Sequence, residues 1–86
     1  MTRTRSDIEA EVRGLLERIA PGVDLQSVPR AADLRGELDL DSMDFLSFVV
    51  GLDERLGVEI PEEDYPEMTT LDGAVDYLLS RLSPGH

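Results

Sequence analysis

One serine, Ser42, lies in the segment ELDLDSMDF at residues 37–45, where every charged neighbour is an acid. A serine hydroxyl attacks as a nucleophile when an imidazole takes its proton; otherwise it caps a helix or accepts a covalent modification. The only histidine, His86, is the last residue, and the G-x-S-x-G motif is absent because position 40 is Leu and position 44 is Asp. We therefore expect no catalysis by Ser42, and both capping and modification remain open.

The carboxylates around Ser42 do not follow the pattern of a known cation-binding loop. An EF-hand beginning at Asp39 requires Gly at its sixth position and Glu at its twelfth, where the chain has Asp44 and Val50. The sequence also contains no phosphate-binding P-loop, no dinucleotide glycine motif and no cysteine. We therefore predict no specific metal site and no enzymatic activity. Because Ser42 has no base of its own, a second protein would have to catalyse any modification.

The net charge of −11 is concentrated in one part of the chain. Residues 37–67 hold eleven acids and one base, Arg55, whereas residues 1–36 are neutral. Such a charge repels nucleic acid and anionic membranes, so neither is an expected partner. The acids form either a solubilising face or a complement to a basic protein surface. No apolar run is long enough for a membrane span and the start lacks a secretory signal, so we expect a cytoplasmic monomer.

The elements that must position Ser42 are predicted to be helices of a single domain, residues 1–86. A first helix, about 6–19, is predicted to begin with a capping box of Ser6 and Glu9. One face of this helix is apolar, with Ile8, Val12, Leu15, Leu16 and Ile19. Residues 20–40 show no long periodic pattern and contain Pro29, so we expect a long loop there.

A second helix, about 41–56, is predicted to begin directly before Ser42. Asp41 is the expected N-cap, Asp44 the acidic partner of a capping box, and Gly57 the residue that ends the helix. One apolar stripe comprises Phe45, Phe48, Val49, Leu52 and Leu56, and a second comprises Met43, Leu46 and Val50. Together they cover roughly 220° of the helical wheel, more than a surface helix needs. The helix is therefore either central to a bundle or presents part of its apolar arc to a partner.

Two further helices complete the predicted fold. A short third helix, about 61–66, begins at Pro61 and is expected to stop at Pro66. A fourth helix, about 70–82, follows the helical pattern closely and is expected to be capped by Thr69 with Asp72. No alternating strand pair is present in the sequence. The prediction is an all-α four-helix bundle, with three main helices, one short helix and a long first loop.

The segment DLDSMDFLSFVVGLDERLGVEIPEED, Asp39 to Asp64, resembles the acyl carrier protein family. Asp-Ser-Met at 41–43 is similar to the family's Asp-Ser-Leu/Met attachment motif. LDERLGVEIPEED is similar to the segment that joins the family's second and third helices, and TTLDGAVDYLLSRL is similar to its last helix. The tripeptide alone is a weak signal, but the combination is highly specific and covers nearly the whole chain.

This resemblance implies that Ser42 carries a 4′-phosphopantetheine arm, installed from coenzyme A by a phosphopantetheinyl transferase. The thiol of the arm would tether acyl groups as thioesters for a fatty-acid, specialised-lipid or polyketide-type pathway. The family's second helix and its flanking acids meet basic patches on loading, synthase and transferase enzymes. On that resemblance the expected partner-binding residues are Asp39, Asp41, Met43, Asp44, Phe45, Leu46, Ser47, Glu54, Glu62 and Glu63.

The chain departs from the usual family pattern at several positions. Asp39 replaces a frequent glycine, and Asp tolerates unusual backbone angles better than most residues. Ser47 stands where fatty-acid carriers have an acid, Phe45 where they often have Val or Thr, and Leu56 where they often have Phe. The helix is thus more apolar near the attachment site, which favours a specialised carrier. A peptidyl or aminoacyl carrier, or an unmodified acidic adaptor that binds a basic surface, are the alternatives.

Overall fold

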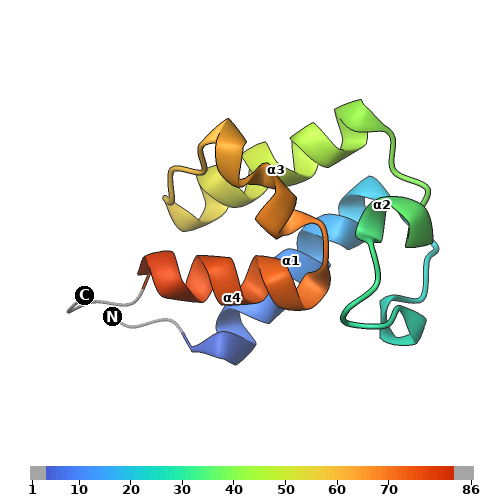
Figure 1. Cartoon of the computed structure of the whole chain (residues 1–86). Coiled ribbons are helices and arrows are strands. Elements are labelled where there is room, and N and C mark those ends of the chain that lie inside the picture. The colour runs from blue at the N-terminus through green and yellow to red at the C-terminus, as the bar shows by residue number, and fades with distance from the viewer. Residues whose placement is uncertain (1–3, 83–86) are drawn as a thin grey trace.

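The computed structural model describes residues 4–82 and is built from helices (Figure 1). Its elements are the α-helices α1 (Arg5–Ile19), α2 (Leu34–Glu37), α3 (Ser42–Leu56) and α4 (Leu71–Leu82), with 3₁₀ helices η1 (Leu25–Ser27) and η2 (Glu62–Met68). Over this described range the only β-type pairing is an isolated bridge between Asp33 and Thr70. The predicted all-α fold class is therefore confirmed.

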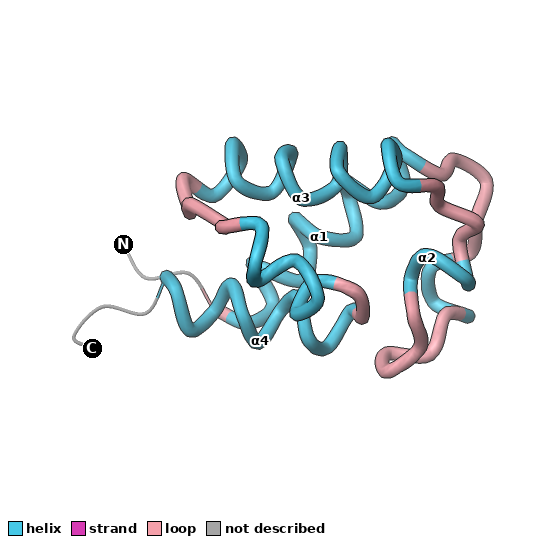
Figure 2. The backbone as a smooth tube through the Cα atoms, turned by 45° about the horizontal axis from the view of Figure 1, so that its top comes forward, coloured by secondary structure: helices cyan, strands magenta, loops and turns pink. Residues whose placement is uncertain are grey.

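Helix α1 is the common partner of the two other long helices. It packs against both α3 and α4, and η2 packs on α4. Figures 1 and 2 show α2 and the connection that leads to α3 gathered at one end of the bundle, where α3 begins. The Asp64 carboxylate holds η2 to α4, because it accepts hydrogen bonds from Tyr77 Oη at 2.6 Å and Arg81 Nη2 at 2.9 Å. Contacts with α1 and α4 thus hold α3 and η2 in the bundle.

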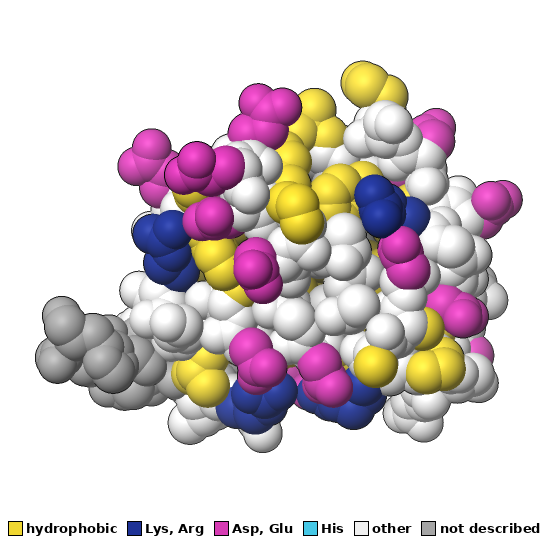
Figure 3. All heavy atoms as spheres, in the orientation of Figure 1, with side chains coloured by type: hydrophobic (Ala, Val, Ile, Leu, Met, Phe, Trp, Pro, Cys, Tyr) yellow, Lys and Arg dark blue, Asp and Glu magenta, His cyan; other side chains and the backbone are white. Residues whose placement is uncertain are grey.

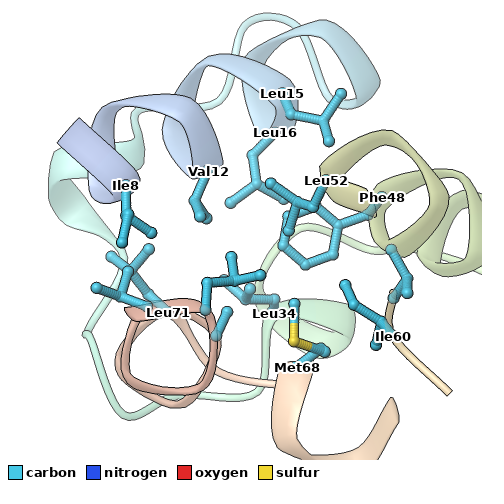
Figure 4. Close-up of a cluster of buried hydrophobic side chains, with 14 of the residues drawn as sticks. Ile8, Val12, Leu15, Leu16, Leu34, Phe48, Leu52, Ile60, Met68 and Leu71 are labelled. Atoms are coloured by element: carbon cyan, nitrogen blue, oxygen red, sulfur yellow. The ribbon is translucent and has the colours of Figure 1, made fainter. Parts of the chain in front are cut away.

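The core lies between these helices (Figure 4). Leu16 of α1 points toward Phe48 and Leu52 of α3, Ile8 and Val12 point toward the side of the core that α4 lines, and all five side chains are almost completely buried. Leu34, Val49, Met68, Leu71, Ala74, Val75 and Leu78 complete its fully buried centre. Each large apolar side chain contributes about 1.5–3 kcal/mol when it leaves water. No polar or charged side chain is buried among the described residues, so this core contains no hidden polar site.

The start of α1 differs from the prediction. Its N-cap is Thr4, whose hydroxyl accepts from the Asp7 N–H at 3.1 Å while the Asp7 carboxylate accepts from the Thr4 N–H at 3.0 Å. The predicted capping box of Ser6 and Glu9 is therefore wrong. The Glu9 carboxylate instead accepts hydrogen bonds from Arg30 and Arg13, which occupy both of its oxygens.

The expected loop at residues 20–40 is also wrong in part, since it contains η1 and α2. The Asp33 carboxylate caps α2 by accepting from the Arg35 N–H at 2.9 Å. The Leu34 N–H donates to the Thr69 carbonyl at 2.7 Å, which ties α2 to the segment before α4. A four-residue helix is too short for an apolar period, so the sequence pattern could not reveal it.

The last two helices begin or end at other residues than predicted. Pro66 lies inside η2 and does not stop it, because the buried Met68 and a bond from the Thr69 hydroxyl to the Pro66 carbonyl hold the next turn. The start of α4 is capped by Thr70, whose hydroxyl accepts from the Gly73 N–H at 2.9 Å. The predicted cap of Thr69 with Asp72 is wrong, since the Asp72 carboxylate binds Arg30.

Candidate functional site

Ser42 is the first residue of α3, and its side chain is exposed. The preceding Asp41 is the N-cap, as predicted, and its carboxylate accepts from the Asp44 N–H at 2.8 Å. The reciprocal bond of a capping box, from the Asp41 N–H to the Asp44 carboxylate, is not formed within residues 4–82, so the predicted box is half complete. In the same range the Ser42 hydroxyl forms no hydrogen bond. Asp41 therefore does the capping, and the Ser42 hydroxyl has no structural task.

A tight turn presents Ser42 to solvent. Asp39 has a φ of 56°, and it is the only described residue besides glycine with a positive φ. Leu38 and Leu40 on either side are buried, and the Leu40 N–H donates to the Arg35 carbonyl at 2.9 Å. This agrees with the expectation that Asp39 accepts a backbone conformation usually left to glycine. The two leucines anchor the turn in the core, and α3 then starts at the surface.

A pocket of about 510 Å³ opens beside Ser42. Its lining consists of Arg35, Leu40, Asp41, Ser42, Phe45, Leu46 and Tyr65. The Tyr65 ring meets the Phe45 ring edge-on, with 6.4 Å between the ring centres, and the centre of the buried Phe48 ring lies 6.3 Å from that of Phe45. An aromatic wall therefore connects the pocket with the buried core.

Arg35 supplies the positive charge of this pocket. Its guanidinium carbon lies 5.6 Å from the centre of the Phe45 ring. Its Nε and Nη2 atoms donate to the two carboxylate oxygens of Asp33 at 3.1 and 2.9 Å. These bonds hold the pKa of Asp33 below its usual value, and they raise the pKa of Arg35. The guanidinium is thus charged and held in one orientation over the aromatic ring.

The outer face of α3 carries an exposed apolar stripe. Met43, Leu46 and Val50 are 71%, 41% and 42% exposed, whereas Phe48 and Leu52 are buried. One stripe therefore largely fills the core, as expected of a central helix, and the other faces solvent, where its contact with a partner stays a prediction. Figure 3 shows hydrophobic atoms at the surface over α3 with acidic side chains around them.

The predicted partner-binding residues divide into two groups. Eight have exposed side chains, namely Asp39, Asp41, Met43, Leu46, Ser47, Glu54, Glu62 and Glu63, and two are half-buried, Asp44 and Phe45. The pocket brings together the predicted Asp41, Phe45 and Leu46, whereas Glu54 lies toward the far end of α3. The structure adds three residues that sequence reasoning missed, Arg35, Leu40 and Tyr65. A local signal existed only for Arg35, as the last base before the acidic segment.

Neither a metal centre nor a membrane span is present in the described part of the chain. Residues 4–82 contain no group of three or more His, Asp or Glu side chains placed to hold a metal ion. None of the helices in this range is long and apolar enough to cross a membrane. The exposed serine and its pocket are therefore the principal candidate site of the described chain.

Comparison with known proteins decides the family. A family model described as "Phosphopantetheine attachment site" matches residues 10–78. The acyl carrier protein of Rubrobacter xylanophilus is 40% identical over 58 residues, which cover 67% of this chain and 72% of that protein. The chain belongs to the acyl carrier protein family. The solved structure of the Enterococcus faecalis acyl carrier protein matches with a TM-score of 0.73 at 26% identity, over 92% of this chain and 99% of that one.

Membership identifies the prosthetic group as 4′-phosphopantetheine, as the sequence resemblance implied. Acyl carrier proteins are carriers, not enzymes, and they work with synthases, transferases and phosphopantetheinyl transferases. The residues around Ser42 fit such a group. The hydroxyl is exposed and free of hydrogen bonds within residues 4–82, and a charged guanidinium and an apolar pocket lie beside it.

Proposed function

We propose that this chain is an acyl carrier whose phosphopantetheine arm is attached at Ser42. The observation that carries the proposal is that Asp41, and not Ser42, caps the start of α3. Asp41 caps α3 through the Asp44 N–H, and the Ser42 hydroxyl stays exposed with no bond to lose among residues 4–82. Conversion of that hydroxyl to a phosphodiester therefore costs the described fold no hydrogen bond.

The chain's own residues present the hydroxyl and leave the chemistry to others. When bound, the arm supplies a thiol that holds acyl groups as thioesters. Leu38 and Leu40 fix the turn before the helix, and Asp41 fixes its first turn, so the Ser42 oxygen has a defined position. Among the residues that the structure describes, none that lines the pocket beside it has an imidazole or amine to take its proton. A phosphopantetheinyl transferase that binds coenzyme A as the donor must therefore provide the base.

The exposed stripe on α3 is the proposed docking surface for partner enzymes. Met43, Leu46 and Val50 offer an apolar centre on the helix that begins at Ser42. Acidic side chains surround it, with Asp39 and Asp41 before the helix and Glu54 toward its end. Glu62 and Glu63 add two exposed acids at the start of η2. An apolar centre with a charged rim matches the anatomy of a transient interface, and its partner would carry a basic rim.

The cargo pathway is proposed to be a specialised lipid or polyketide-type route. Ser47 is exposed on α3 where fatty-acid carriers have an acid, and Phe45 lines the pocket where they often have a smaller side chain. Ser47 lowers the charge near the attachment site, and Phe45 makes that part of the helix more apolar. We expect purified general fatty-acid synthase enzymes to elongate acyl chains more slowly on this chain than on their own carrier. Equal rates would contradict the specialised assignment.

The attachment is tested by intact-mass measurement. The protein is incubated with coenzyme A and a promiscuous phosphopantetheinyl transferase. We expect a gain of one phosphopantetheine group, and no gain for Ser42→Ala. Ser80→Ala is the matched control, because Ser80 is an exposed serine on another helix, α4, and is not among the expected partner-binding residues, so it should gain the group. An unchanged mass of the unaltered chain would favour the acidic adaptor, and cargo analysis after loading would distinguish acyl from aminoacyl carriers.

A further inference from the structure

We infer that Arg35 is a positioning residue for the arm, binding its phosphodiester and folding its first segment over the pocket beside Ser42. The inference rests on the proposed attachment at Ser42. It goes beyond that attachment, because it assigns a second side chain, from a different element, to the same group. It also commits the pocket to one occupant, the phosphodiester and the dimethyl-bearing segment that follows it.

The geometry places the guanidinium within reach of a group on Ser42. Residues three apart on a helix are surface neighbours, with about 5–6 Å between their Cβ atoms, so Ser42 and Phe45 lie side by side at the start of α3. The guanidinium carbon of Arg35 lies 5.6 Å from the Phe45 ring centre. All three residues line the same pocket. A phosphate on the Ser42 oxygen therefore lies next to the aromatic ring that the guanidinium covers.

The guanidinium has donors left for this phosphate. An arginine side chain has five N–H donors in a planar fork. The N–H of Nε and one N–H of Nη2 donate to the Asp33 carboxylate. The two N–H groups of Nη1 have no acceptor within residues 4–82. Asp33 and Phe45 together hold the fork in place, so little side-chain freedom is lost when Nη1 binds a phosphate. Charge-assisted bonds from arginine to phosphate are among the stronger hydrogen bonds in proteins.

The charge distribution directs the phosphate to this side. A diester on Ser42 adds a negative charge to a turn that already carries Glu37, Asp39, Asp41 and Asp44. Arg35 is the basic side chain in the lining of the adjacent pocket. The next arginine along the chain, Arg55, lies in the last turn of α3 and pairs with Glu11 at 3.1 Å. The Arg35 guanidinium is therefore the cation that can offset the repulsion between the phosphodiester and these carboxylates.

The rest of the pocket suits the segment that follows the phosphate in the arm. This segment carries two methyl groups on one carbon, and the pocket offers the side chains of Phe45, Leu46 and Tyr65. Phosphate on Arg35 and methyl groups on the aromatic wall would hold the first part of the arm against the protein. Arg35 would then set the balance between a folded-back arm and one extended toward a partner.

The test uses NMR of the armed protein, after intact mass has shown one group per chain. In the unaltered protein we expect nuclear Overhauser contacts from the arm's methyl protons to the Phe45 and Tyr65 rings. We expect Arg35→Gln to lose these contacts and to shift the ³¹P resonance of the diester. Arg55→Gln is the matched control, since it removes the same charge elsewhere on the bundle. This variant should keep the ring contacts and the ³¹P resonance of the unaltered protein. Amide spectra of the unarmed forms establish that each variant is folded.

Each outcome bears on the inference. Ring contacts that persist in armed Arg35→Gln, or that are missing from the armed unaltered protein, would overturn the role of Arg35 and leave the attachment at Ser42 intact. Failure of the unaltered protein to gain any mass would overturn both. If Arg35→Gln does not fold, a salt titration of the unaltered armed protein replaces it. There the ring contacts should weaken as salt screens the pair, and contacts that are insensitive to salt would contradict the inference.

Discussion

The carboxylate of Asp41 and the backbone N–H of Asp44 are joined by a 2.8 Å hydrogen bond that spans Ser42. This bond satisfies one of the unpaired donors at the start of α3. The hydroxyl between the two residues is thereby left exposed, with no hydrogen bond in the described range. Ser42 is therefore not needed as a helix cap, because Asp41 caps α3, and its hydroxyl is available for modification.

We expect Asp41→Ala to lower the free energy of unfolding by about 0.5–2 kcal/mol, since it removes the N-cap of α3. Ser42→Ala should change it by less than about 0.5 kcal/mol, as for a surface substitution that breaks no bond. Asp41→Asn retains a capping oxygen, so its free energy of unfolding should be close to that of the unaltered protein. Urea unfolding of the unarmed forms measures all three. Equal losses for Asp41→Ala and Ser42→Ala would show that Ser42 does share in capping.

The left-handed turn at Asp39 gives a second prediction. Its φ of 56° is poorly tolerated by β-branched side chains, so Asp39→Val should cost about 1–3 kcal/mol of stability. Asp39→Asn removes the same charge but keeps the tolerance for this conformation, and Asp39→Gly has no Cβ to strain. Both should remain within about 1 kcal/mol of the unaltered protein in urea unfolding. If Asp39→Asn is as unstable as Asp39→Val, the charge and not the backbone is responsible.

The close packing of the Glu67 carbonyl against Gly73 gives a third prediction. A Cβ atom there would lie 2.7 Å from the Glu67 carbonyl oxygen and 2.8 Å from the Thr70 hydroxyl oxygen. The backbone must shift to relieve this contact, so Gly73→Ala should lose about 1–3 kcal/mol. Gly36→Ala is the control, because a Cβ there meets nothing within 4 Å. That variant should be neutral or gain up to about 1 kcal/mol, and a thermal melt that ranks the two variants in the opposite order would refute the packing argument.

The ion pair of Glu9 with Arg30 gives a pH prediction. Hydrogen bonding from Arg30, with a further bond from Arg13, lowers the pKa of Glu9 from 4.5 to about 2. A carboxyl group with a lowered folded pKa stabilises the fold above about pH 4.5, and that contribution disappears as the pH falls toward 2. Glu9→Gln should therefore be less stable at pH 7 and lose less stability between pH 4.5 and 2. Chemical denaturation at several pH values measures this.

Glu17→Gln is the matched control for that experiment. Glu17 is an exposed acid on the same helix and forms no ion pair within residues 4–82. Its pH dependence between 4.5 and 2 should match that of the unaltered protein. If Glu9→Gln and Glu17→Gln give the same curve, the Arg30 pair contributes nothing to acid stability.

Features that depend on residues close together along the chain could be predicted from the sequence. The apolar period of α3, the cap at Asp41 and the end at Gly57, which has a φ of 66°, were all predictable. Each reflects side-chain or backbone contacts within about one helical turn, which the order of residues encodes directly. The acidic character of residues 37–67 and the attachment motif at 41–43 were equally legible from the chain.

Where two local patterns were equally favourable, contacts between distant segments selected one of them. Thr4 and Ser6 each precede an acid by three residues, and Glu9 is removed from capping because Arg30, from the distant loop, binds it. The pocket beside Ser42 joins Arg35, Phe45 and Tyr65, which are 10 and 20 residues apart along the chain. No local pattern predicts such a meeting, because it arises when packing of the core brings one residue each from α2, α3 and η2 to the lining of one pocket.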